Sequence, residues 1–131
     1  MGTGISFEPR ILRIELPPGL PLLNANDRIH YRSRSKITEQ LRSEACRAAK
    51  AEHWLPFGKV RVRCIFRAPD NRRRDVSNLF PSFKAVLDGI VDAGVLKDDN
   101  DKFVREFTIV RGENLPKLGQ LIIQIIEVTD D

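Results

Sequence analysis

Apolar and polar side chains alternate in two stretches of the first half of the chain, residues 10–16 and 59–68. The apolar members are Leu12, Ile14 and Leu16 in the first stretch and Val60, Val62, Cys64 and Phe66 in the second. A period of two places one set of side chains on a buried face of a strand and the other on an exposed face. The pattern therefore predicts two half-buried strands, and the arginines at alternate positions predict a basic outer face for the second.

Two further stretches, residues 36–52 and 82–94, carry apolar side chains at the spacing of a helix that packs on a core. Their apolar stripes are Ile37, Leu41, Ala45, Ala48 and Ala49 in the first and Phe83, Val86, Leu87, Ile90 and Val91 in the second. We expect Ser35 or Thr38 to cap the first helix and Ser82 the second, because a hydroxyl accepts the free backbone N–H groups there. Gly94 is expected to end the second helix.

The C-terminal part of the chain contains two more strand-like stretches, residues 103–111 and 118–128, separated by a loop rich in glycine, asparagine and proline. They predict two strands paired as a hairpin. The order strand, helix, strand, helix, strand, strand predicts an α+β fold with a mixed sheet of about four strands and two main helices packed on it. We expect one domain over residues 1–131, with flexible tails at 1–9 and 129–131.

Composition agrees with one globular domain. The 131 residues are 41% hydrophobic and 31% charged, with a formal net charge of +4. That charge permits a polyanionic partner but does not require one. Cys46 and Cys64 lie among apolar residues and are expected to be reduced thiols. Because no apolar run is long enough to cross a membrane, we expect a cytoplasmic protein with no membrane partner.

The distribution of charge is more informative than its sum. The basic run Arg72, Arg73 and Arg74 directly precedes Asp75, and the acidic run 98–101 follows about one helix length later. Arginines bind phosphates, and carboxylates bind hard cations such as Mg²⁺. Together they indicate metal-assisted chemistry on a phosphodiester. The alternative is a charged loop before a helix and an acidic loop after it, because the spacing alone does not show that the two acidic segments meet.

The ordered set of motifs resembles the RusA family of Holliday-junction resolvases over residues 12–128. The motifs are Asp75-Val76-Ser77-Asn78-Leu79, then Lys84-Ala85-Val86-Leu87-Asp88-Gly89, then Ala93-Gly94-Val95-Leu96-Lys97-Asp98-Asp99. An earlier segment with Pro17-Pro18, Asn24, Asn26, Arg28 and Tyr31 is similar to the N-terminal loop of that family. The ordered set is more specific than any one of its pieces.

The resemblance implies a homodimeric endodeoxyribonuclease that nicks four-way junctions or other branched DNA during recombination and repair, with Mg²⁺ or Mn²⁺ as cofactor. It places metal ligands at Asp75, Asp98 and Asp99, and the catalytic role at Asp75, Asp99 and Lys84. Arg72, Arg73 and Arg74 would contact DNA.

Simpler roles are also open for several of these residues. The cluster Arg28, Arg32, Arg34 and Lys36, with Tyr31 between them, predicts either a phosphate-tracking surface or a solvated face. Lys84 and Asp88 are four apart on the expected helix and could form only a surface ion pair. Asn78 is expected to be structural, with at most an auxiliary role. The acids Asp101, Asp130 and Asp131 are expected to be solvated.

One position departs from the family pattern. Ser77 stands where that pattern has a second aspartate, and a hydroxyl can bind Mg²⁺ as an auxiliary ligand but brings no negative charge. Residues 80–82 also add length before Lys84. The alternative hypothesis is therefore a non-cleaving DNA-binding protein that retains the fold. A third hypothesis is a structural protein with no nucleic-acid role.

Overall fold

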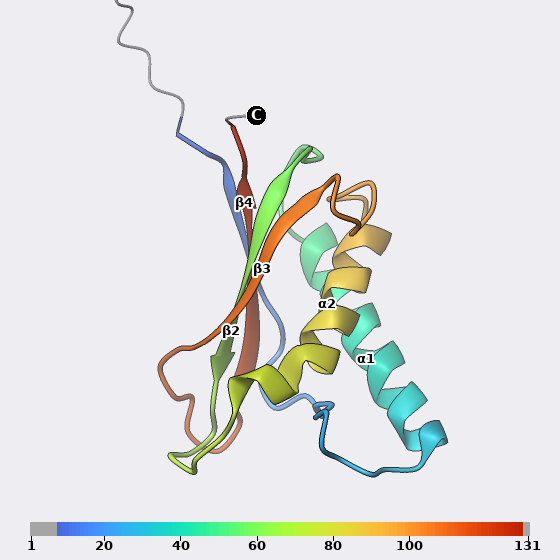
Figure 1. Cartoon of the computed structure of the whole chain (residues 1–131), viewed down its shortest axis with the longest axis vertical. Coiled ribbons are helices and arrows are strands. Elements are labelled where there is room, and N and C mark those ends of the chain that lie inside the picture. The colour runs from blue at the N-terminus through green and yellow to red at the C-terminus, as the bar shows by residue number, and fades with distance from the viewer. Residues whose placement is uncertain (1–7, 130–131) are drawn as a thin grey trace, which may run out of the picture.

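The structure is a computed structural model that describes residues 8–129. A four-stranded sheet lies on one side and two helices pack against one of its faces (Figure 1). The elements are β1 (Ile11–Glu15), α1 (Tyr31–Lys50), β2 (Val60–Arg67), the 3₁₀-helix η1 (Val76–Leu79), α2 (Phe80–Asp92), β3 (Val104–Arg111) and β4 (Gln120–Glu127). The predicted α+β fold is confirmed. Of the predicted tails, residues 1–7 and 130–131 lie outside the described part of the chain.

The sheet has the order β1-β4-β2-β3, which differs from the predicted hairpin. β4 runs antiparallel to both β1 and β2, whereas β2 and β3 are parallel neighbours. The hairpin prediction was therefore wrong. β4 is the most apolar strand and is suited to a place between two others, because one of its faces is buried in the core and the other is at least half-buried. β3 is parallel to β2, so it needs a crossover, and α2 supplies it.

The predicted apolar sets form the core between the sheet and the helices. The buried members are Leu12, Ile14, Leu16, Leu41, Ala45, Ala49, Val60, Val62, Cys64, Phe66, Phe83, Val86, Leu87 and Ile90. Of the remaining predicted helix positions, Val91 is half-buried and packs against the core. Cys46 and Cys64 are both free thiols, as predicted. Burial raises the pKa of the Cys64 thiol.

Both helices begin earlier than predicted. α1 begins at Tyr31, where the His30 side chain caps it by accepting the Arg32 N–H at 3.2 Å, so neither Ser35 nor Thr38 is the cap. α2 begins at Phe80, and Ser82 lies within it, fully buried. We predicted the caps from hydroxyl residues next to the first apolar position of each stripe. The start of α1 was missed because its first turn is polar, and that of α2 because η1 leads directly into it. Gly94 follows α2 with φ of 90°, so the predicted stop is confirmed.

The two helices approach closely at Gly89. A Cβ atom there would lie 2.2 Å from the Arg42 carbonyl oxygen and 2.9 Å from the Ala45 Cβ atom. Beside this contact, the Arg42 guanidinium binds both carboxylate oxygens of Asp92, at 2.5 and 2.8 Å. Within residues 8–129, none of the helices has the length and apolar character needed to cross a membrane.

Candidate nucleic-acid interface and active site

The predicted basic run lies in the loop that leaves β2, next to the start of α2 (Figure 1). We call residues 70–75 the arginine loop. The chain just before it is hydrogen-bonded to the loop between β3 and β4: Leu115 N–H donates to the Ala68 carbonyl at 2.9 Å, and Lys117 N–H to the Pro69 carbonyl at 3.1 Å. The arginine loop is therefore held at the end of the sheet by a segment more than forty positions later in the sequence.

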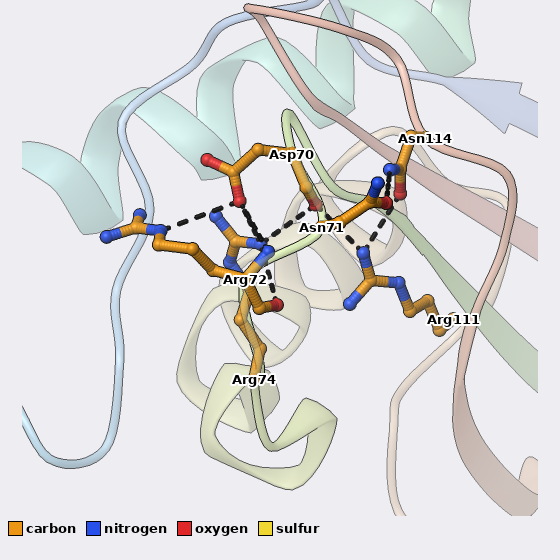
Figure 2. Close-up of polar contacts among 6 residues, drawn as sticks. All are labelled: Asp70, Asn71, Arg72, Arg74, Arg111 and Asn114. Atoms are coloured by element: carbon orange, nitrogen blue, oxygen red, sulfur yellow. Dashed lines mark hydrogen bonds and ion pairs between the residues drawn. The ribbon is translucent and has the colours of Figure 1, made fainter.

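Asp70 contacts three arginines in and around the arginine loop (Figure 2). Its Oδ1 atom accepts the backbone N–H of Arg72 at 3.0 Å and lies 2.8 Å from Nη1 of Arg74. Its carbonyl oxygen accepts Nη2 of Arg111 at 2.9 Å. The hydrogen bond and charge of Arg74, with the Arg72 N–H, lower the pKa of Asp70 to about 2.

The three arginines of the run have different surroundings. The Arg72 side chain is 79% exposed and 3.5 Å from Asp70, whereas that of Arg74 is only 19% exposed. Arg73 is exposed and has no ion pair among the described residues. We expected the three arginines to act as one phosphate-binding unit. In the structure they differ in exposure and in ion pairing.

A groove of about 540 Å³ runs between the arginine loop and the segment before α1. Its polar lining comes from Asn24, Asn26, Asp27, Arg72, Arg73, Arg74, Asp75 and Asn78. Two contacts hold its outer wall: Ala25 N–H donates to the Asn78 carbonyl at 2.8 Å, and the Ser82 hydroxyl both accepts from and donates to the backbone of Leu23, each at 2.7 Å. The Asn78 backbone thus helps to hold this wall, whereas the structural role expected of the Asn78 side chain stays a prediction.

Asp75 lies at the groove and caps η1. Its Oδ1 atom accepts the Ser77 hydroxyl at 2.7 Å and the Ser77 N–H at 3.1 Å, and these two hydrogen bonds lower the pKa of Asp75. Ser77, the residue that departs from the family pattern, therefore contacts Asp75 directly.

Lys84 forms a second group with the acids of the later motifs. Its Nζ atom donates to Asp88 at 2.7 Å and to Asp99 at 2.5 Å. Partial burial opposes the charge of Lys84, but hydrogen bonds to Asp88 and Asp99 raise its pKa, and the hydrogen bond from Lys84 lowers the pKa of Asp99. Asp98 is turned to its own loop, where it accepts the Asp99 N–H and the Asn100 side chain. The expected Lys84–Asp88 pair is present, and the sequence-distant Asp99 joins it.

The described side chains do not fit a metal centre as placed. Among residues 8–129, no three His, Cys, Asp or Glu side chains are close enough to hold one ion together. Asp75 is bonded to Ser77 and Asp99 to Lys84, in separate hydrogen-bonded groups. A metal ion needs several oxygen ligands at once, and this arrangement does not provide them.

The second basic cluster lies at the start of α1. Arg28, Arg32 and Lys36 are exposed and Arg34 is half-buried. The Arg32 guanidinium lies 5.9 Å from the centre of the Tyr31 ring. The centres of the Tyr31 and His30 rings are 4.6 Å apart, with the ring planes tilted by 31°. Residues 22–27, which directly precede this cluster, line the groove opposite the arginine loop. The second basic cluster therefore begins where the wall of the groove ends.

Sequence reasoning missed four polar residues of the site: Asp70, Asn71, Arg111 and Asn114. Asp70 stands next to the basic run and could have been paired with it. Arg111 and Asn114 come from the end of β3 and the loop after it, and only the parallel pairing of β2 with β3 brings them to the arginine loop.

The chain is similar in sequence to two known proteins. No family model matches the chain. It is 34% identical over 70 residues to the crossover junction endodeoxyribonuclease RusA of Enterobacteria phage HK97, a match that spans 53% of each protein. It is 32% identical over 112 residues to an uncharacterized protein of Xylella fastidiosa, covering 82% of this chain and 71% of that protein. The chain therefore belongs to one family with the Xylella protein, and about half of it is similar to a RusA resolvase.

Proposed function

We propose that this protein is a RusA-like endodeoxyribonuclease that nicks branched DNA, four-way junctions above all. The observation that carries the proposal is the arginine-lined groove with Asp75 at its edge, in a chain similar to a phage resolvase. A groove that combines guanidinium groups with a carboxylate suits a phosphodiester, because arginine binds phosphate oxygens and steers the polyanion to the site.

Several side chains have defined parts in this proposal. Arg72 and Arg73 bind backbone phosphates, and Arg28, Arg32, Arg34 and Lys36 extend the contact along the DNA. Lys84 provides a fixed positive charge for the developing charge on the reacting phosphate. Mg²⁺ or Mn²⁺ at Asp75, Asp98 and Asp99 rests on the family resemblance, because these three carboxylates do not meet in the structure.

Nicking of a synthetic four-way junction tests the proposal. We expect metal-dependent cleavage by the parent chain, loss of cleavage in Asp75→Asn and Asp99→Asn, and retained junction binding in both, because the amide preserves shape and removes charge. Asp101→Asn is the matched control, since Asp101 is exposed. Near-normal cleavage by both Asp75→Asn and Asp99→Asn would contradict these roles.

A second candidate function is DNA binding without cleavage. It is favoured by the contact between Ser77 and Asp75 at the position where the family pattern has a second carboxylate. Junction binding with no cleavage at any Mg²⁺ or Mn²⁺ concentration would select it. If Ser77→Asp then created cleavage, the missing carboxylate would be the reason.

We also propose that the protein acts as a homodimer. Resolution of a four-way junction needs two symmetry-related cuts, and a two-fold dimer presents two identical sites. β4 lies between β1 and β2 and offers no free edge for a dimer contact. Three of its isoleucines, Ile122, Ile123 and Ile125, are buried within the protomer.

A further inference from the structure

The Arg74 side chain lies inside the arginine loop rather than on its surface. Its Nη1 atom donates to the carbonyl oxygens of Asp70 and Arg72, at 3.2 and 3.3 Å, and forms the 2.8 Å ion pair with the Asp70 carboxylate. The guanidinium also lies 6.0 Å from the centre of the buried Phe66 ring. With these contacts and a side chain only 19% exposed, Arg74 crosslinks its own loop.

Asp70 completes this crosslink from the other end of the loop. One carboxylate oxygen receives both the Arg72 N–H and the Arg74 guanidinium, so it fixes the turn at residues 70–72 and the side chain of Arg74 together. Charge-assisted hydrogen bonds of this kind are shorter and stronger than neutral ones.

The crosslinked loop is anchored to the strand beyond it (Figure 2). Nη2 of Arg111 donates to the Asp70 carbonyl and to Oδ1 of Asn114, both at 2.9 Å, and the Asn114 side chain in turn donates to Oδ1 of Asn71. The anchor leaves the Arg73 side chain without an ion-pair partner among the described residues.

We propose that Asp70 and Arg74 form a latch, anchored by Arg111 and Asn114, that holds the arginine loop in the conformation that presents Arg72 and Arg73 to a nucleic-acid backbone. Arg74 and Asp70 are positioning residues in this view, and Arg74 does not bind phosphate. The inference rests on the proposed function, because it takes the polyanion at this loop to be DNA.

The Asp70→Asn variant distinguishes the latch from simple electrostatics, because the two predict opposite effects. Removal of a negative charge beside a phosphate site should tighten DNA binding if only charge matters. The latch predicts weaker binding of a short duplex, by about fivefold, the scale of one lost hydrogen bond. Glu113→Gln is the matched control: it removes an exposed carboxylate from the neighbouring loop and should bind as tightly as the parent or more tightly. Equal affinities of Asp70→Asn and Glu113→Gln would overturn the proposal.

Arg74→Lys provides a second test that does not depend on net charge. A phosphate contact tolerates the exchange, because the ammonium keeps the charge, whereas the latch loses the planar group that reaches two carbonyls and a carboxylate. We expect several-fold weaker duplex binding by a chain that still folds, shown by a cooperative thermal transition whose midpoint falls only by the loss of the Asp70–Arg74 pair. Binding equal to the parent would show that Arg74 acts through charge alone, and would overturn the latch.

Side-chain nitrogen resonances test the latch without DNA. In the parent chain, rotation about the Arg74 guanidinium bonds should be slow and that of Arg73 fast, and Asp70→Asn should release Arg74. Free rotation of Arg74 in the parent would overturn the proposal. If Arg74 is held but the parent binds no duplex at low salt, the proposed function fails, and the latch has no nucleic acid to position for.

Discussion

At the scale of single residues, Asp70 gives a prediction about pH. Its carboxyl has a pKa of about 2 in the folded chain, chiefly because Arg74 binds it, against roughly 3.9 when unfolded. Between these values the unfolded chain binds more protons, so the stability from this pair is fully present above about pH 4 and is lost as pH falls through about 2. Urea unfolding should therefore show parent and Asp70→Asn differing at pH 5 to 7 and converging toward pH 2. A difference that persists unchanged to pH 2 would contradict the assigned pair.

Gly89 gives a prediction about packing. An alanine inside a helix usually stabilises it by ~0.5–1 kcal/mol relative to glycine. Here the added Cβ would lie 2.2 Å from the Arg42 carbonyl oxygen, a backbone atom that cannot turn away. We expect Gly89→Ala to lose roughly 2 kcal/mol, because overpacking forces the helices apart, measured as a lower urea midpoint at unchanged slope.

Gly58→Ala is the control for this change, because no atom lies within 4 Å of a Cβ at Gly58. Its unfolding midpoint should stay close to that of the parent. An equal effect of the two substitutions would show that backbone freedom, and not the contact between α1 and α2, decides the result.

The candidate site was predictable only where its residues are close in sequence. The Lys84–Asp88 pair joins residues four positions apart, and the helical spacing identified it. The Asp75–Ser77 contact joins residues only two positions apart but was not predicted, because Ser77 was considered only as an auxiliary metal ligand. The Lys84–Asp99 contact was not predicted: the family resemblance assigned both residues to one active site but implied no hydrogen bond between them. Arg111 could not be found, because its contact with Asp70 depends on a strand pairing that periodicity does not specify.

At the scale of elements, Ser82 connects the start of α2 to the wall of the groove. Its buried hydroxyl satisfies both the N–H and the carbonyl of Leu23. Ser82→Ala leaves both groups buried without a partner and should destabilise the fold by about 2 kcal/mol. It should also weaken DNA binding at constant charge, because the segment 22–27 loses its attachment at Leu23 and keeps only the one between Ala25 and Asn78.

Ser43→Ala is the comparison for Ser82, because Ser43 lies exposed on α1. Chemical denaturation and duplex binding should both be unchanged in this variant. Weaker duplex binding by a Ser82→Ala chain of unchanged stability would still support the attachment of Leu23 to Ser82. Unchanged stability together with unchanged duplex binding would contradict it.

Sequence patterns predicted the elements better than their pairing. The alternation in β1 and β2 and the stripe on α2 follow from burial on one face, which is a local property of the sequence. Strand order is not local. β3 and β4 are adjacent in the chain and were expected to form a hairpin, but β4 is apolar on both faces and takes the place between β1 and β2.

At the scale of the whole molecule, function depends on how the site is repeated. The arginine loop and η1 lie at one end of the sheet, and α2 runs from there along the helix layer toward the other end (Figure 1). In the proposed function, one protomer would bring Asp75 and the arginine groove to one strand of a junction. Two linked cuts at symmetric positions therefore need a second copy, and sedimentation should give twice the 15.0 kDa mass of the chain at micromolar concentration.

A mixing experiment makes the dimer prediction specific. A plasmid with an extruded cruciform is linearised when both cuts fall within one binding event and is only nicked when a single cut occurs. We expect the parent protein to linearise it, and an excess of Asp75→Asn subunits to shift the product to nicked circles, because mixed dimers carry one competent site. Asp101→Asn subunits should leave linearisation intact.

Two outcomes would contradict the prediction. If Asp75→Asn subunits form mixed dimers with the parent and the ratio of linear to nicked product does not change, the two cuts are made independently of each other. If the parent cleaves nothing, sedimentation with and without junction DNA decides the oligomer on its own, and a monomer in both would refute it.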